Sequence, residues 1–169
     1  KETDLRKIIH DAVAMFPGQV EVAGPETPVL LPVDEVRLRQ SILSLLQNAR
    51  RYGGPSITAA LEQSSTGFVI SVEDDGPGLS AAEKSQAFDR FFRGSNASGQ
   101  GTKGSGLGLP VVKSIVQAHG GTVALQDVEN SGLRVVITLP REPRMTVVSS
   151  GPATRKSAIG VRFARLGGC

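Results

Sequence analysis

The chain has 169 residues, of which 39% are hydrophobic and 21% charged, and this composition excludes both a disordered and a collagen-like chain. No run approaches the roughly 20 apolar residues of a bilayer span, and a single cysteine, Cys169, excludes an internal disulfide or a multi-cysteine metal site. The net charge of +3 arises in residues 141–169, because residues 1–140 hold 13 Lys and Arg against 15 Asp and Glu. No aromatic-interleaved basic stripe accompanies this charge, so we expect no nucleic-acid partner.

Apolar side chains in the first half of the chain recur with the period of helices in two stretches and with the period of strands in others. In chain order they predict a helix over 5–16, short strands over 19–22 and 29–31, a second helix from 34 to 52, and strands over 57–61 and 68–72. Asp4 and Asp34 are the expected N-caps of the two helices. The Ser- and Gly-containing turn between the last two strands indicates a hairpin.

The second half continues with a helix over 81–88, a Gly- and Ser-rich stretch over 94–106, a helix over 107–118 that ends at His119, and strands over 122–126 and 133–139. We expect the stretch 94–106 to be mobile, and 141–169 to form a basic, flexible tail after a domain over 1–140. This mixture of helices and hairpins favours an α+β fold. It predicts a two-layer sandwich with a mixed, mainly antiparallel sheet of about five strands, covered on one face by about three helices.

Two common phosphate-binding patterns are absent from the sequence. A Walker loop requires a glycine directly before its lysine, and neither Lys103 nor Lys113 follows a glycine. The glycines at 104, 106 and 108 also miss the spacing of a dinucleotide-binding fingerprint. Any nucleotide site must therefore be built from other clusters.

The second predicted helix carries three side chains of chemical interest near its end. Asn48 offers a neutral carboxamide oxygen, which suits Mg²⁺, an ion that keeps several waters and takes few protein ligands. Arg51 and Tyr52 follow within one turn, where they can contact a phosphate and a planar ring. Asn48 alone would be interpreted as an ordinary surface or capping residue.

A second cluster follows the expected strand over 68–72. Asp74 can accept a hydrogen bond from an exocyclic amine, and Gly76 and Gly78 let the backbone turn closely past a ligand. Such a hydrogen bond would discriminate adenine from guanine. The plain alternative is a simple Asp-Gly-Pro-Gly turn.

Two further clusters bracket the stretch 94–106, which we expect to act as a lid. Phe88 to Arg93 precedes it, and Gly104 to Gly108 closes it at the start of a helix. Glycines at a helix N-terminus expose backbone N–H groups and the positive end of the helix dipole, which attract a triphosphate. Taken singly, Phe91 and Phe92 would be interpreted as core anchors. Arg90 and Arg93 would be interpreted as solvated charges.

In this order, the four clusters strongly resemble the N, G1, F and G2 boxes of the catalytic ATP-binding domain of bacterial sensor histidine kinases. The matching positions are Asn48, Asp74-x-Gly76-x-Gly78, Phe88 with Phe91-Phe92-Arg93, and Gly104-x-Gly106-x-Gly108. The resemblance spans roughly 4–140 and implies the Bergerat ATP-binding sandwich. It also implies a protein-histidine kinase domain with ATP and Mg²⁺ as cofactors.

The resemblance implies a role for each matching residue. Asn48 would hold Mg²⁺, Arg51 and Arg93 would contact phosphates in catalysis, and Tyr52 would stack on the ring. Asp74 would bind the adenine amine. The remaining nucleotide-binding positions would be Gly76, Gly78, Lys103, Gly104, Gly106, Leu107 and Gly108.

One position separates this chain from related ATPases that hydrolyse their nucleotide. The ATPase chain of DNA gyrase and the mismatch-repair clamp carry a Glu four residues before the metal-binding Asn, where this chain has Ser44. A serine has no useful basicity at neutral pH, so hydrolysis is disfavoured and phosphoryl transfer is the better fit. Many sensor kinases have a second Asn at this position.

The phosphate acceptor is expected outside this chain. His10 is followed by Asp11, but Val13 stands where a phosphoacceptor motif needs a basic residue, and Pro17 comes too late. His119 is expected only to cap its helix. The resemblance therefore implies, as partners, an upstream dimerisation domain with the acceptor histidine and a response regulator. It also implies a cytoplasmic domain of a protein in the bacterial inner membrane.

Three other functions remain open at this point. A nucleotide-responsive scaffold would bind ATP without transferring phosphate, and a serine kinase of the anti-sigma type would share the fold but modify a partner protein. A basic tail that binds membrane or DNA is the third.

Overall fold

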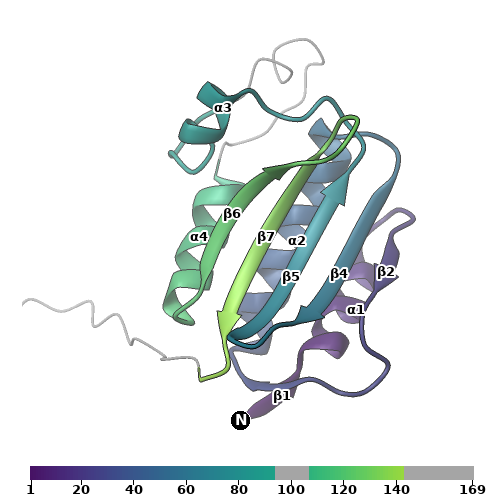
Figure 1. The fold of residues 1–169 in the computed structure, drawn as a ribbon, viewed down its shortest axis with the longest axis vertical. Coiled ribbons are helices and arrows are strands. Elements are labelled where there is room, and N and C mark those ends of the chain that lie inside the picture. The colour runs from purple at the N-terminus through teal and green to yellow at the C-terminus, as the bar shows by residue number, and fades with distance from the viewer. Residues whose placement is uncertain (94–106, 143–169) are drawn as a thin grey trace, which may run out of the picture.

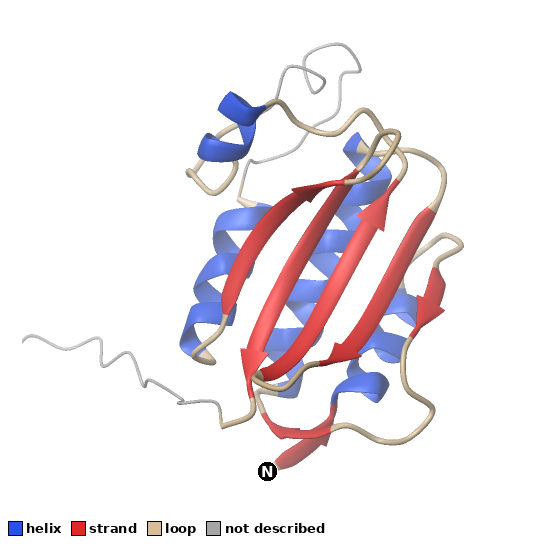
Figure 2. Cartoon of the chain, viewed as in Figure 1, coloured by secondary structure: helices blue, strands red, loops and turns tan. Residues whose placement is uncertain are grey.

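The computed structural model describes residues 1–93 and 107–142, and these form two layers (Figure 1). The elements are β1 (Glu2–Asp4), α1 (Leu5–Met15), β2 (Glu21–Ala23), β3 (Leu30–Pro32), α2 (Glu35–Tyr52), β4 (Ile57–Gln63), β5 (Gly67–Asp74), α3 (Ala81–Gln86), α4 (Gly108–Ala118), β6 (Thr122–Asp127) and β7 (Leu133–Pro140). Helices α1, α2 and α4 cover one face of the main sheet (Figure 2). The expected α+β sandwich is confirmed.

The main sheet has the strand order β2-β4-β5-β7-β6, and three of its four pairings are antiparallel. The hairpin predicted on either side of the turn at 64–66 is the β4–β5 pair, with Ile57 opposite Asp74. The edge strand β2 pairs parallel to β4, which makes the sheet mixed, as expected.

The sequence did not predict strand β1. It forms a separate two-stranded antiparallel sheet with β3, in which Thr3 lies opposite Leu31. Asp4 fastens this corner, because its Oδ1 accepts hydrogen bonds from the N–H groups of Arg6 and Val29, both at 3.0 Å. Three residues are too few to show the alternation of apolar and polar side chains that marks a strand. The strand forms only because it pairs with β3 in the folded chain.

The helices differ from expectation mainly at their ends. α3 is shorter than the predicted 81–88, since Phe88 already lies in a turn, and it carries a capping box between Ser80 and Glu83. Among the described residues, no helix is long and apolar enough to cross a bilayer. The expected mobile stretch 94–106, and 143–169 of the expected tail, lie outside the described residues.

The core lies between the helical layer and alternate side chains of the sheet. Fully buried residues from both layers meet there, among them Leu38, Ile42, Leu45, Leu46, Ile70, Val112, Val116, Ile137 and Leu139. The same face of β5 ends in the carboxylate of Asp74, which is only 6% exposed. The strand that supplies the core thus delivers a buried acid to one end of the sheet.

His119 connects the two helices that carry the predicted clusters. It is the C-cap of α4, as expected, and is 1% exposed. Its Nε2 accepts a hydrogen bond from the N–H of Asp34 at 2.9 Å, and its Nδ1 donates to the carbonyl of Ile115 at 2.8 Å. The side chain therefore joins the end of α4 to the beginning of α2.

Replacing His119 with Ala should lower the free energy of unfolding by about 2–3 kcal/mol, because it leaves a partly buried N–H and a buried carbonyl without partners and opens a cavity. Urea unfolding followed by circular dichroism measures this loss. His10→Ala is the matched control, since His10 is exposed on α1 and should be neutral. Equal effects of the two substitutions would contradict the bridging role of His119.

Candidate functional site

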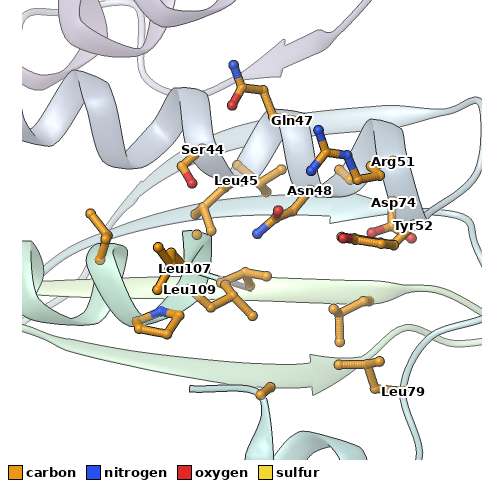
Figure 3. Close-up of a pocket in the computed structure, with 18 of the residues that line it drawn as sticks. Ser44, Leu45, Gln47, Asn48, Arg51, Tyr52, Asp74, Leu79, Leu107 and Leu109 are labelled. Atoms are coloured by element: carbon orange, nitrogen blue, oxygen red, sulfur yellow. The ribbon is translucent and has the colours of Figure 1, made fainter. Parts of the chain in front are cut away.

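A cavity of about 530 Å³ opens between α2, the start of α4, the end of β5 and the start of β7 (Figure 3). Eight of the predicted site residues line it, namely Asn48, Arg51, Tyr52, Asp74, Gly78, Arg93, Leu107 and Gly108. Gly76 does not line the cavity but lies directly behind Asp74. Lys103, Gly104 and Gly106 lie outside the described residues.

Asp74 places a buried carboxylate at one end of this cavity. Its Oδ1 accepts a hydrogen bond from the N–H of Gly76 at 2.9 Å. Burial raises the pKa of Asp74 above its usual range, although backbone hydrogen bonds from Gly76 and Leu133 partly oppose that rise. A second donor from a ligand would satisfy the carboxylate further, so the group is suited to recognise an amine.

The backbone packs unusually closely behind Asp74. A Cβ added to Gly53 would lie 2.4 Å from the Asp74 Cγ, and one added to Gly76 would lie 2.4 Å from the Gly53 Cα. Only residues without a side chain allow this approach. The sequence predicts only that a helix ends before Gly53. It does not predict that the Asp74 carboxylate packs against the backbone of Gly53.

The neighbouring Asp75 has a different role. It is exposed, and its Oδ1 accepts a hydrogen bond from the N–H of Ser56 at 3.0 Å. It therefore stabilises the turn after α2, while Asp74 faces the cavity. The two adjacent acids offer a natural pair for mutagenesis.

Asn48 lies farther along the cavity, against the first residue of α4. A Cβ on Gly108 would be 3.1 Å from Asn48 Nδ2 and 3.2 Å from Ser44 Oγ. In Figure 3 both side chains reach from α2 toward Leu107 and Leu109, while Gln47 points away. Clusters that are 60 residues apart in the sequence thus meet at this point.

The Asn48 carboxamide is half-buried and has no hydrogen-bond partner among the described residues. A neutral oxygen donor facing a cavity fits a magnesium ion that keeps most of its water and phosphate ligands. No group of three His, Cys, Asp or Glu side chains that could hold a metal occurs within residues 1–93 and 107–142. The role of Asn48 as a metal ligand therefore stays a prediction, based on its amide oxygen at the cavity.

The remaining predicted residues surround the two ends of the cavity. Tyr52 lies at the Asp74 end in Figure 3, and the Arg51 guanidinium is 5.9 Å from the centre of its ring. Phe92 and Arg93 line the wall that follows α3. Phe91 differs, since it is 72% exposed, does not line the cavity and has a left-handed backbone with φ 67°.

Sequence reasoning missed the apolar wall of the site. Val72 of β5 and Leu133 and Val135 of β7 line the cavity, although the sequence pattern predicted only that they lie in strands. A signal was present, because Val72 and Asp74 share one face of their strand. The pocket is an extension of the core, bounded by polar groups at its ends.

The raised pKa of Asp74 makes a prediction about stability. Because the pKa is higher in the folded state, this carboxyl favours folding while protonated, and the benefit is lost as the pH rises through the folded pKa. Asp74→Asn should therefore increase the free energy of unfolding at pH 7, and the gap should close below the ordinary carboxyl pKa of 3.8. Urea unfolding at both pH values, with Asp75→Asn as a control expected to give a smaller change, tests this. A gain that does not vary with pH would contradict it.

Comparison with known proteins is consistent with this geometry. Residues 33–143 match the family described as histidine kinase-, DNA gyrase B-, and HSP90-like ATPase. The probable sensor histidine kinase TcrY of Mycobacterium tuberculosis is 37% identical over 133 residues, which cover 72% of this chain and 27% of TcrY. The chain thus spans less than a third of that relative.

Solved structures show the same relationship. The mycobacterial sensor histidine kinase MprB superposes with a TM-score of 0.74 at 29% identity, covering 85% of this chain and all of that one. The ATP-binding domain of PrrB from Mycobacterium tuberculosis gives a TM-score of 0.64 at 25% identity, covering 83% of this chain and 96% of that one. Sequence, fold and cavity agree, and the chain belongs to the family of histidine kinase-, DNA gyrase B- and HSP90-like ATPases.

Proposed function

We propose that this chain is the catalytic domain of a sensor histidine kinase, which binds ATP with Mg²⁺ and donates the γ-phosphoryl group to a histidine on another domain. One observation carries the proposal. The buried carboxylate of Asp74 and the carboxamide of Asn48 open onto the same cavity, with Gly108 packed beside Asn48. An amine-recognising group and a metal-suited group at separate places in one pocket fit a metal-bound adenine nucleotide.

The chemistry follows from where these groups lie. Asp74 accepts a hydrogen bond from the adenine amine, and the apolar wall of Val72, Leu133 and Val135 contacts the ring face. Tyr52 lies at the same end of the cavity and packs against the base. These contacts leave the triphosphate directed toward Asn48 and the start of α4.

The phosphate end of the cavity supplies charge but no nucleophile. Asn48 holds Mg²⁺, which neutralises charge on the transferring phosphoryl group when bound, and Arg51 and Arg93 line the same cavity as cationic partners for phosphate. The predicted roles of Lys103, Gly104 and Gly106 in binding the triphosphate belong to this proposal. Leu107 and Gly108 border the same end.

Ser44 favours transfer over hydrolysis. It faces Gly108 beside Asn48, where a carboxylate base would be needed to activate water, and a hydroxyl cannot take that proton at neutral pH. The relatives named as sensor histidine kinases favour histidine as the acceptor over the serine of an anti-sigma-type kinase or a scaffold without transfer. The kinase interpretation therefore has two independent supports.

The partners follow from the same proposal. The acceptor histidine lies on a dimerisation domain in the part of the protein that this chain does not span, and the phosphate passes to an aspartate of a response regulator. The domain works on the cytoplasmic side of a membrane-anchored protein, where ATP is present. TcrY and the Escherichia coli sensor histidine kinase CpxA, each named as a sensor kinase, support this assignment.

Asp74→Asn should weaken binding of a fluorescent ATP analogue about 100-fold, because Gly76 already occupies the Oδ1 position and the new amide would turn a donor toward the adenine amine. Fluorescence titration measures the dissociation constant. Asp75→Asn is the matched control and should bind normally. Near-normal affinity of the Asp74 variant would refute the assignment of Asp74 to adenine.

Asn48→Ala should slow Mg²⁺-dependent phosphorylation of a supplied acceptor domain about 100-fold, because the metal loses its protein ligand. Labelled ATP and detection of acid-labile phosphate on histidine measure the rate. Gln117→Ala removes the same kind of side chain from an exposed position of α4 that does not line the cavity, and should leave the rate unchanged. An unchanged rate for the Asn48 variant would rule out the metal role.

A further inference from the structure

The wall of the cavity that follows α3 is attached to a helix with little packing of its own. Ala87, Phe92 and Arg93 line the cavity, yet α3 itself buries none of its residues. Figure 1 shows α3 apart from the helical layer, near the start of α4 and the end of β6. The capping box between Ser80 and Glu83 makes this helix a self-contained turn. It is therefore suited to move as one piece.

Two lysines connect this segment to the rest of the domain from different directions. Lys84 of α3 places its Nζ 2.6 Å from the Asp127 Oδ2 at the end of β6. Lys113 of α4 places its Nζ 5.4 Å from the centre of the Phe88 ring, which is cation–π distance. The Lys84–Asp127 ion pair holds α3, and the Lys113 contact holds Phe88, the residue directly after Ala87.

Neither lysine lines the cavity. Lys84 is 22% exposed and its partner Asp127 is 70% exposed, so the ion pair adds little to global stability. Its effect is larger on a segment with few other contacts, because a weak interaction there sets how often the segment is docked. The two contacts thus act on local order more than on folding.

We propose that Lys84 and Lys113 are positioning residues, which hold the segment 87–93 in the arrangement that completes the nucleotide pocket. The inference rests on the proposed function, because its readout is nucleotide affinity. When only a fraction of the molecules has the wall docked, the apparent dissociation constant rises in inverse proportion to that fraction. Two charges that the ligand does not touch therefore tune its binding.

The test measures the affinity of a fluorescent ATP analogue for the whole chain and its variants. Lys84→Gln and Lys113→Gln should each raise the dissociation constant about threefold, and the double variant about tenfold, while the melting temperature stays the same. Lys7→Gln is the matched control, because Lys7 forms a pair with Asp11 at the same 2.6 Å on α1, and it should bind as the wild type does.

Rescue separates positioning from general damage. Lys113→Arg keeps the cation over Phe88 and should restore affinity, and the exchanged pair Lys84→Asp with Asp127→Lys should recover most of what Lys84→Asp loses. Amide hydrogen exchange of residues 81–93 without nucleotide should quicken in both Gln variants and not in Lys7→Gln. Unchanged exchange, or a lowered melting temperature that accounts for the whole loss of affinity, would overturn the positioning role.

The outcomes also distinguish the two proposals. If the wild-type chain binds no ATP analogue, the proposed function fails, and this inference fails with it. If the wild type and Lys7→Gln bind while Lys84→Gln and Lys113→Gln bind equally well, only the positioning role fails. Weaker binding by the two Gln variants, with rescue, supports both.

Discussion

The site depends on the close approach of two backbone segments around one carboxylate. Gly53, at the end of α2, and Gly76, after β5, leave no room for any side chain between them and Asp74. This contact brings the end of a helix against the end of a strand, and it fixes where the acid faces. Because the carboxylate is buried, its charge is costly, and the proposed role of Asp74 in recognising adenine would come at some expense of stability.

Helix α2 serves both the core and the cavity. Leu38, Ile42 and Leu45 bury one side of it, while Asn48 and Tyr52 come at the margin of that buried stripe. The helix can therefore not rotate to adjust the site without exposing the core. His119 holds the beginning of α2 against the end of α4, and at the other end of this helix pair the Asn48 side chain packs beside the backbone of Gly108.

The elements with strong periodicity could be predicted from the sequence, and so could the convergence of the residues at their ends on one cavity. Helix α2, the β4–β5 hairpin, Asp74 and Asn48 all belong to this class. Strand β1 and the bridge from His119 to Asp34 could not be predicted, because both depend on residues that meet only after the chain has folded. The role of Gly53 could not be predicted either, because it depends on the close approach of Asp74 in the folded chain.

The parallel pairing of β2 with β4 has a consequence for how the domain folds. It joins residues 21–23 to residues 58–60, and α2 lies in the chain between them. Such a pairing requires a long segment to close before any of its hydrogen bonds form, whereas the β4–β5 hairpin and α2 need only local contacts. The hairpin and helix that carry Asp74 and Asn48 therefore need only short loops to close, whereas the outer edge of the sheet at β2 depends on closure of the longer segment that contains α2.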